Sequence, residues 1–100
     1  MHEPTTLTKI LEERGKTYGP FIDNAKVAQN LKDVVEGDKT CILYPDMREA
    51  IDVICSKIAR IVTGDPTYID NWDDIAGYAT LVANRLRKDK DVEAPAEEAR

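Results

Sequence analysis

The sequence has little of the chemistry that metal–thiolate and nucleophilic sites require. It contains one histidine, His2, and two cysteines, Cys41 and Cys55, which stand fourteen positions apart. Zinc sites are built from closely spaced Cys and His ligands, so this spacing argues against one. No Ser or Cys stands in a turn of the kind that holds a nucleophile. Walker-type and dinucleotide glycine loops are also missing from the sequence.

Long apolar runs and excess positive charge are absent as well. No run is long enough to cross a bilayer, and the N-terminus has no secretory signal pattern. The net charge of −5 argues against an extended nucleic-acid surface, because such surfaces neutralise phosphates with Lys and Arg. We therefore expect a cytoplasmic protein with free thiols and no membrane partner. Cys55 falls on an apolar helical stripe and is expected to behave as a small buried hydrophobic residue.

Four segments carry apolar residues at intervals of three and four. These intervals predict helices over Thr6–Arg14, Phe21–Val35, Pro45–Thr63 and Asp70–Lys88. Gly15 is expected to end the first helix and Gly64 the third. The third helix is expected to begin either with Asp46 in a capping box or with Pro45 at an early helical position.

The predicted fold is an all-α bundle of four helices in one domain, residues 1–88, followed by a disordered charged tail, residues 89–100. The short apolar run 41–44 is interpreted as a connector, because no second strand-like run exists to pair with it. On the fourth helix the residues expected to face inward are Trp72, Ile75, Ala76, Ala79, Val82 and Leu86. A chain of 100 residues buries a thin core, so we also expect a homo-oligomer, either a dimer or a tetramer.

Two polar groups on the last two helices are candidates for a metal site. Glu49 and Asp52 lie three residues apart and share one helical face. Asn71, Asp74 and Tyr78 follow the margin of the next helix, where they could face a cleft. Mg²⁺ commonly takes one or two carboxylates together with substrate phosphate and water. The simpler interpretation is a solvated face on one helix and dipole-stabilising acids at the start of the other.

Basic and aromatic residues nearby suit a phosphate ligand. Lys57 and Arg60 stand about one turn beyond Asp52, where they could offset substrate charge, or simply favour the C-terminal end of their helix. Lys16 and Tyr18 lie in a turn-forming cluster where they could meet a phosphate and a base. Tyr18 could equally anchor this turn to the core.

Several segments resemble a family of small, uncharacterised phage and prophage proteins. They are 11–19, 56–61, 64–66 and 70–79, the last of which, Asp-Asn-Trp-Asp-Asp-Ile-Ala-Gly-Tyr-Ala, is the most specific. That family is distantly similar to the all-α nucleoside triphosphate pyrophosphohydrolases of the MazG and dimeric dUTPase type. The resemblance implies a MazG-like four-helix core, usually oligomeric, and the cytoplasm of a host cell if the protein is phage-encoded.

The same resemblance implies Mg²⁺ held by carboxylates on two adjacent helices. The matching positions here are Glu49, Asp52, Asn71 and Asp74. Asn71 is neutral where the enzymes carry an acid, and loss of ligand charge weakens metal binding.

Three functions follow from these patterns. The first is a Mg²⁺-dependent pyrophosphohydrolase, with Glu49, Asp52 and Asp74 as catalytic ligands and Asn71 as an auxiliary ligand. In this hypothesis Lys16, Tyr18, Lys57, Arg60 and Tyr78 contact the nucleotide. The second is a non-catalytic protein that sequesters a nucleotide. The third is a small helical protein that binds a host protein through its acidic surface.

Overall fold

The computed structural model describes residues 5–38 and 41–93, and every regular element within those ranges is an α-helix. The helices are α1 (Thr6–Tyr18), α2 (Phe21–Gly37), α3 (Pro45–Thr63) and α4 (Ile69–Glu93). The predicted all-α, four-helix fold is confirmed. Helix α4 runs five residues past its predicted end, so the predicted tail overlaps it. The rest of that tail, 94–100, lies outside the described residues, as does His2.

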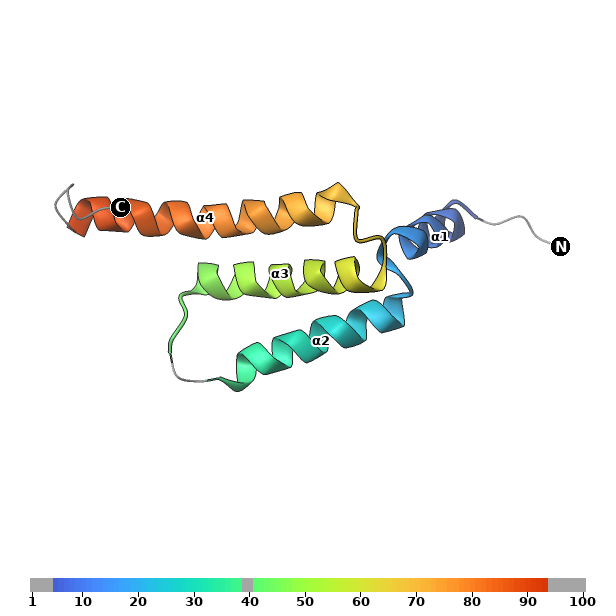
Figure 1. Cartoon of the computed structure of the whole chain (residues 1–100), viewed down its shortest axis with the longest axis horizontal. Helices are drawn as coiled ribbons and strands as arrows, with labels where there is room; N and C mark the ends of the chain where they lie inside the picture. Colours follow the sequence, from blue (N-terminus) through green and yellow to red (C-terminus); the bar gives the residue numbers. More distant parts are fainter. Residues whose placement is uncertain (1–4, 39–40, 94–100) are drawn as a thin grey trace.

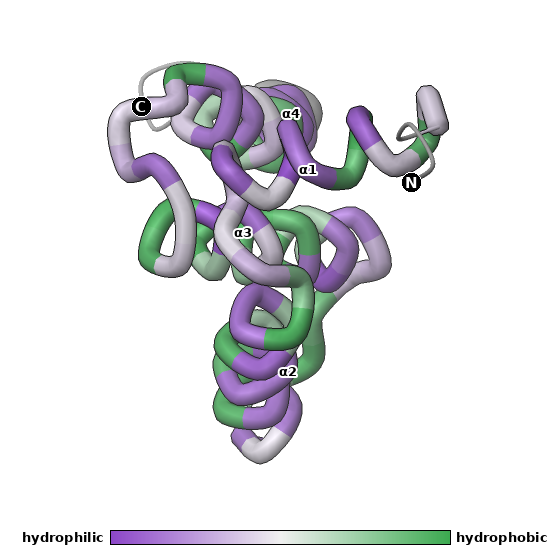
Figure 2. Tube along the Cα trace, turned by 90° about the vertical axis from the view of Figure 1, so that its right-hand side faces the viewer, coloured by the Kyte–Doolittle hydropathy of each residue, from purple (hydrophilic) through white to green (hydrophobic). Residues whose placement is uncertain are grey.

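Helices α2, α3 and α4 lie side by side with α3 in the middle (Figure 1). Seen end-on, these three helices are stacked in a single layer and α1 projects from one side of it (Figure 2). None of the residues of α1 is buried. Within the described part of the chain, no helix is both long enough and apolar enough to traverse a membrane.

Most of the apolar residues that one chain buries are small. The buried apolar residues are Ala28, Ala50, Cys55, Ala59 and Ile61. Cys55 is therefore the small buried hydrophobic residue that the sequence predicts, whereas Cys41 is exposed. Burial raises the pKa of the Cys55 thiol, and the nearby negative charge of Asp52 raises it further.

One of the two glycines predicted to end a helix lies inside that helix instead. Gly15 does not stop α1, because the helix continues through it to Tyr18. Gly19 ends the helix instead: its φ is 81°, a left-handed value that favours glycine, and its N–H donates to the Gly15 carbonyl at 2.9 Å. At the start of α3 the Pro45 alternative is correct, since no side chain caps this helix. Gly64 follows the last residue of α3, as predicted.

The face of α4 that packs on α3 shares only part of the apolar stripe predicted for the fourth helix: Ile75 and Val82 are half-buried, as predicted, and the other four residues are exposed. Trp72 is 50% exposed and its indole Nε1 donates to the Pro66 carbonyl at 2.8 Å. Ala76, Ala79 and Leu86 are exposed as well. The face that meets α3 is centred on Asn71, Asp74, Ile75, Val82 and Arg85, because the side-chain contacts described below set the rotation of α4.

Candidate functional site

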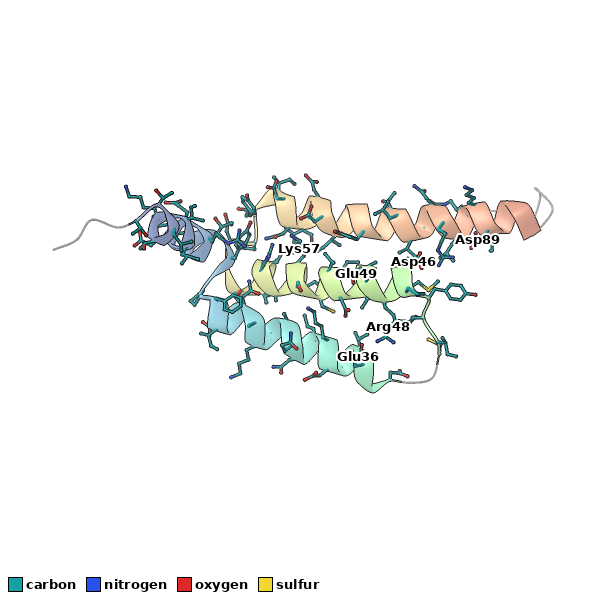
Figure 3. All side chains as sticks on the ribbon, turned by 180° about the vertical axis from the view of Figure 1, so that it is seen from behind. Glu36, Asp46, Arg48, Glu49, Lys57 and Asp89 are labelled. Carbon is teal, nitrogen blue, oxygen red and sulfur yellow. The ribbon has the colours of Figure 1, made fainter. Side chains whose placement is uncertain are left out.

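Two ion pairs fix the register between the antiparallel helices α3 and α4. Lys57 Nζ lies 2.8 Å from Asp74 Oδ2. Eleven residues nearer the start of α3, Arg85 donates to both carboxylate oxygens of Asp46, at 2.5 and 2.8 Å. Figure 3 shows Lys57 and Asp46 on the side of α3 that faces α4. Both pairs belong to one antiparallel register. In this register Arg60, three residues after Lys57, lies at the level of Asn71, three residues before Asp74.

The Arg85–Asp46 pair also changes the electrostatics at the start of α3. The bidentate hydrogen bonds from Arg85 lower the pKa of Asp46, and the partly buried position of the carboxylate opposes this shift. The guanidinium also lies over the Tyr44 ring, 5.1 Å from its centroid. Asp46 therefore acts as the partner of Arg85 and not as a helix cap.

The register separates the predicted metal ligands. Asp74 meets Lys57, which stands five residues past Asp52, or about 7.5 Å along the helix. Asp52 lines a hollow of about 260 Å³ between α2, the segment 41–44 and α3, on the other side of α3 from α4. Within residues 5–38 and 41–93, no three His, Cys, Asp or Glu side chains lie close enough to hold a metal ion. Glu49, Asp52, Asn71 and Asp74 do not form a four-ligand set in one chain, because the helix register holds the two pairs apart.

Asn71 is the most enclosed polar residue of the described chain. Its exposed fraction is 1%, and its side-chain Nδ2 has no hydrogen-bond partner among the described residues. The sequence placed Asn71 at the margin of α4, whereas the structure places it in the α3–α4 contact. A buried donor without an acceptor costs about 1–3 kcal/mol, so such a group usually serves a ligand, a water or a function.

An aromatic and cationic cluster lies where α1, α3 and the start of α4 meet. We call it the Tyr18 cluster, and it consists of Arg14, Tyr18, Arg60 and Tyr68. The Arg60 guanidinium lies 4.6 Å from the Tyr18 ring centroid and that of Arg14 lies 5.0 Å from it. Tyr68 contacts the same ring edge-to-face, with centroids 5.8 Å apart. Neither arginine forms an ion pair with a carboxylate of the described residues, so both positive charges are available to an anion.

The Tyr18 cluster is positioned by a close crossing of two chain segments. The Thr63 hydroxyl donates to the Tyr18 carbonyl at 2.8 Å, and the Asp65 N–H donates to the Thr17 carbonyl at 2.7 Å. A Cβ atom on Gly19 would overlap the Thr63 carbonyl, and one on Gly64 would overlap the Thr17 carbonyl. Gly19 and Gly64 therefore have a structural role, which is to let α1 end against the end of α3.

The turn that follows Gly64 is ordered by its own side chains. Asp65 accepts hydrogen bonds from the Thr67 hydroxyl and backbone N–H, at 2.7 and 2.9 Å, and these bonds lower the pKa of Asp65. Tyr68 then enters the cluster. A hydrogen bond to Asp70 raises the pKa of the Tyr68 phenol, and the negative charge of Asp70 adds to this effect.

The other predicted ligand-binding residues lie apart from the cluster. Lys16 is exposed and its Nζ lies 3.5 Å from Glu13 on its own helix. Tyr78 lies on α4, two turns beyond Asn71. Sequence reasoning missed Arg14 and Tyr68. The signal for Arg14 was its position four residues before Tyr18, which places both on one face of α1.

The site residues fall within one family model. This model, described as a domain of unknown function, DUF6378, matches residues 5–86. The chain belongs to the DUF6378 family. No curated protein and no solved structure matches it. The matched range of this DUF6378 chain includes both sides of the glycine crossing, the Tyr18 cluster and Asn71.

Proposed function

We propose that this protein binds a nucleotide, or a related small molecule with a phosphate group, without requiring a metal. The observation that carries the proposal is the buried Asn71 amide, which has a donor to offer and no acceptor. The register places it opposite Arg60 and one turn from Lys57. A ligand that meets these groups must supply acceptor oxygens and negative charge, and phosphate supplies both.

The Tyr18 cluster suggests how such a ligand enters. Each arginine now rests on the Tyr18 ring, a contact worth about 0.5–1 kcal/mol at an exposed site. A bidentate, charge-assisted hydrogen bond to phosphate is stronger. We expect Arg60 to leave the ring for the phosphate, which frees one face of Tyr18 to stack on a base.

The resemblance to MazG and dimeric dUTPase-type proteins supports a nucleotide over other phosphate compounds. Those enzymes are usually acidic where this chain has Lys57 and Arg60; here Lys57 pairs with Asp74, and Asn71 lies opposite Arg60. This exchange of charge favours binding over hydrolysis. If the protein is phage-encoded, as the resemblance also implies, sequestration of a host nucleotide is the matching role.

A thermal-shift screen tests the binding proposal. Nucleoside mono-, di- and triphosphates, deoxynucleotides and cyclic dinucleotides are each added with Mg²⁺ and with a chelator. A ligand at one hundred times its Kd stabilises the folded state by about 2.7 kcal/mol, so we expect a clear rise in melting temperature that persists in the chelator.

The matched variants are Arg60→Ala and Arg87→Ala. Arg87 is exposed on α4 and, among the described residues, forms a hydrogen bond with Asn84 alone, so its removal should leave binding unchanged. Arg60→Ala should remove the shift. The proposal fails if the shift in melting temperature requires Mg²⁺, or if Arg60→Ala binds like the wild type. It also fails if no compound in the panel shifts the melting temperature, and that result would favour a protein partner.

Hydrolysis of a nucleoside triphosphate is the second candidate, and one observation favours it. Glu49 and Asp52 form no ion pair with a described residue, so two carboxylates one turn apart on α3 remain available. Two protein carboxylates, together with substrate phosphate and water, are a common set of Mg²⁺ ligands.

This candidate predicts pyrophosphate release that stops in the presence of a chelator. Asp52→Asn should abolish turnover, and Asp74→Asn tests whether the second helix contributes. Release would be followed by chromatography of the nucleotide products. Turnover that survives the chelator, or that is unchanged in Asp52→Asn, would rule out the carboxylate site.

A further inference from the structure

One face of the helix layer is apolar and uncovered. On α3, Ile58 and Val62 lie about 160–200° around the helix from Arg60, which contacts α1. These side chains therefore lie on the side of the layer away from α1. Val62 is 63% exposed and Ile58 is 37% exposed.

Helix α4 continues the same face. Trp72, Ala76, Ala79 and Leu86 recur at intervals of three, four and seven, on the flank of α4 next to the side that packs on α3. Because α3 and α4 are antiparallel and both right-handed, this flank and the Ile58–Val62 flank lie on the same side of the layer. Between Ile69 and Leu86, none of the residues on this face of α4 is charged.

The chain exposes more surface than a compact monomer of its mass. Its accessible area is 7826 Å², whereas a compact monomer of 11.2 kDa exposes about 5,700 Å². Its radius of gyration is 18.2 Å, against about 13 Å for a compact domain of 100 residues. On the apolar face itself, Ile58, Val62, Trp72 and Leu86 are between 37% and 63% exposed, and a standard interface covers roughly 800 Å² on each partner.

We propose that this apolar face is covered by a second copy of the chain. A core of three alanines, one cysteine and one isoleucine gives one copy little hydrophobic stabilisation. The face holds the large side chains that a complete core needs, and a nearly flat layer can pair with its own copy about a two-fold axis. The net charge of −5 does not oppose pairing here, because the acidic residues lie off the face.

The oligomeric state and the single tryptophan test this proposal together. Sedimentation equilibrium of the full chain at tens of micromolar should give twice the chain mass of 11.2 kDa. The midpoint of thermal unfolding should rise with protein concentration. Trp72 fluorescence should be blue-shifted in the dimer and should move to longer wavelength on dilution.

Ala79→Glu and Thr80→Glu form a matched pair. The two positions are adjacent and exposed on α4, and each variant adds one negative charge. They differ in that Ala79 lies on the apolar face and Thr80 does not. Ala79→Glu should weaken the dimer at least a hundredfold, while Thr80→Glu should leave it intact. If Ala79→Glu fails to fold, the wild-type sedimentation and unfolding measurements test the proposal by themselves. A folded wild-type monomer, a concentration-independent midpoint, or equal effects of the two variants would overturn the proposal.

Discussion

Replacing Gly64 by alanine is expected to destabilise the protein by about 3 kcal/mol or more, which for so small a core approaches complete unfolding. The φ of Gly64 is −124°, so backbone strain is not the cause. The cause is the close approach of α1: the added Cβ would overlap the Thr17 carbonyl and the backbone of Tyr18. Backbone atoms cannot rotate away as a flexible side chain can, so the crossing must open. Equilibrium urea unfolding, followed by circular dichroism, measures the change.

Gly15→Ala and Gly77→Ala are the controls. Both glycines are inside helices, and a Cβ at either position would meet nothing within 4 Å. Alanine has the higher helix propensity, so these variants should gain about 0.5–1 kcal/mol. If Gly64→Ala is within about 0.5 kcal/mol of the wild type, the close crossing is not rigid and our account of the glycines is wrong.

Asn71→Leu is expected to stabilise the ligand-free protein by about 1–3 kcal/mol and to abolish the ligand-induced thermal shift. Leucine branches at the same atom as asparagine and replaces an unpaired buried donor with apolar groups. A gain in stability with a loss of binding is the behaviour expected of a residue retained for function. Urea unfolding without ligand and thermal shift with ligand measure the two effects separately.

Asn84→Leu serves as the control, because Asn84 is an exposed residue of the same helix. Its effect on stability should be within about 0.5 kcal/mol, and ligand binding should be unchanged. A large loss of stability in Asn71→Leu would mean that the Asn71 amide already has a partner, such as an internal water. That result would remove the observation on which the binding proposal depends.

The polar positions show where sequence reasoning reached its limit. It selected Arg60, Tyr18 and Asn71 as ligand-contacting residues, and the structure places Arg60 over Tyr18 with Asn71 opposite Arg60 in the register. It also grouped Asp52 with Asp74, which the register separates. Residues on one helix share a face by local geometry, whereas the meeting of two helices depends on their register and rotation.

The sequence by itself determined the number of helices and the end of α3 before Gly64, because apolar periodicity and the effect of glycine are local, whereas it left two alternatives for the start of α3. Only the tertiary structure decided that Gly15 lies within α1 and that Gly19 ends it, since the crossing with Thr63 favours a glycine at that point. It also decided the rotation of α4. Both flanks of this helix carry apolar residues, so periodicity cannot choose between them, whereas the Lys57–Asp74 and Asp46–Arg85 pairs can.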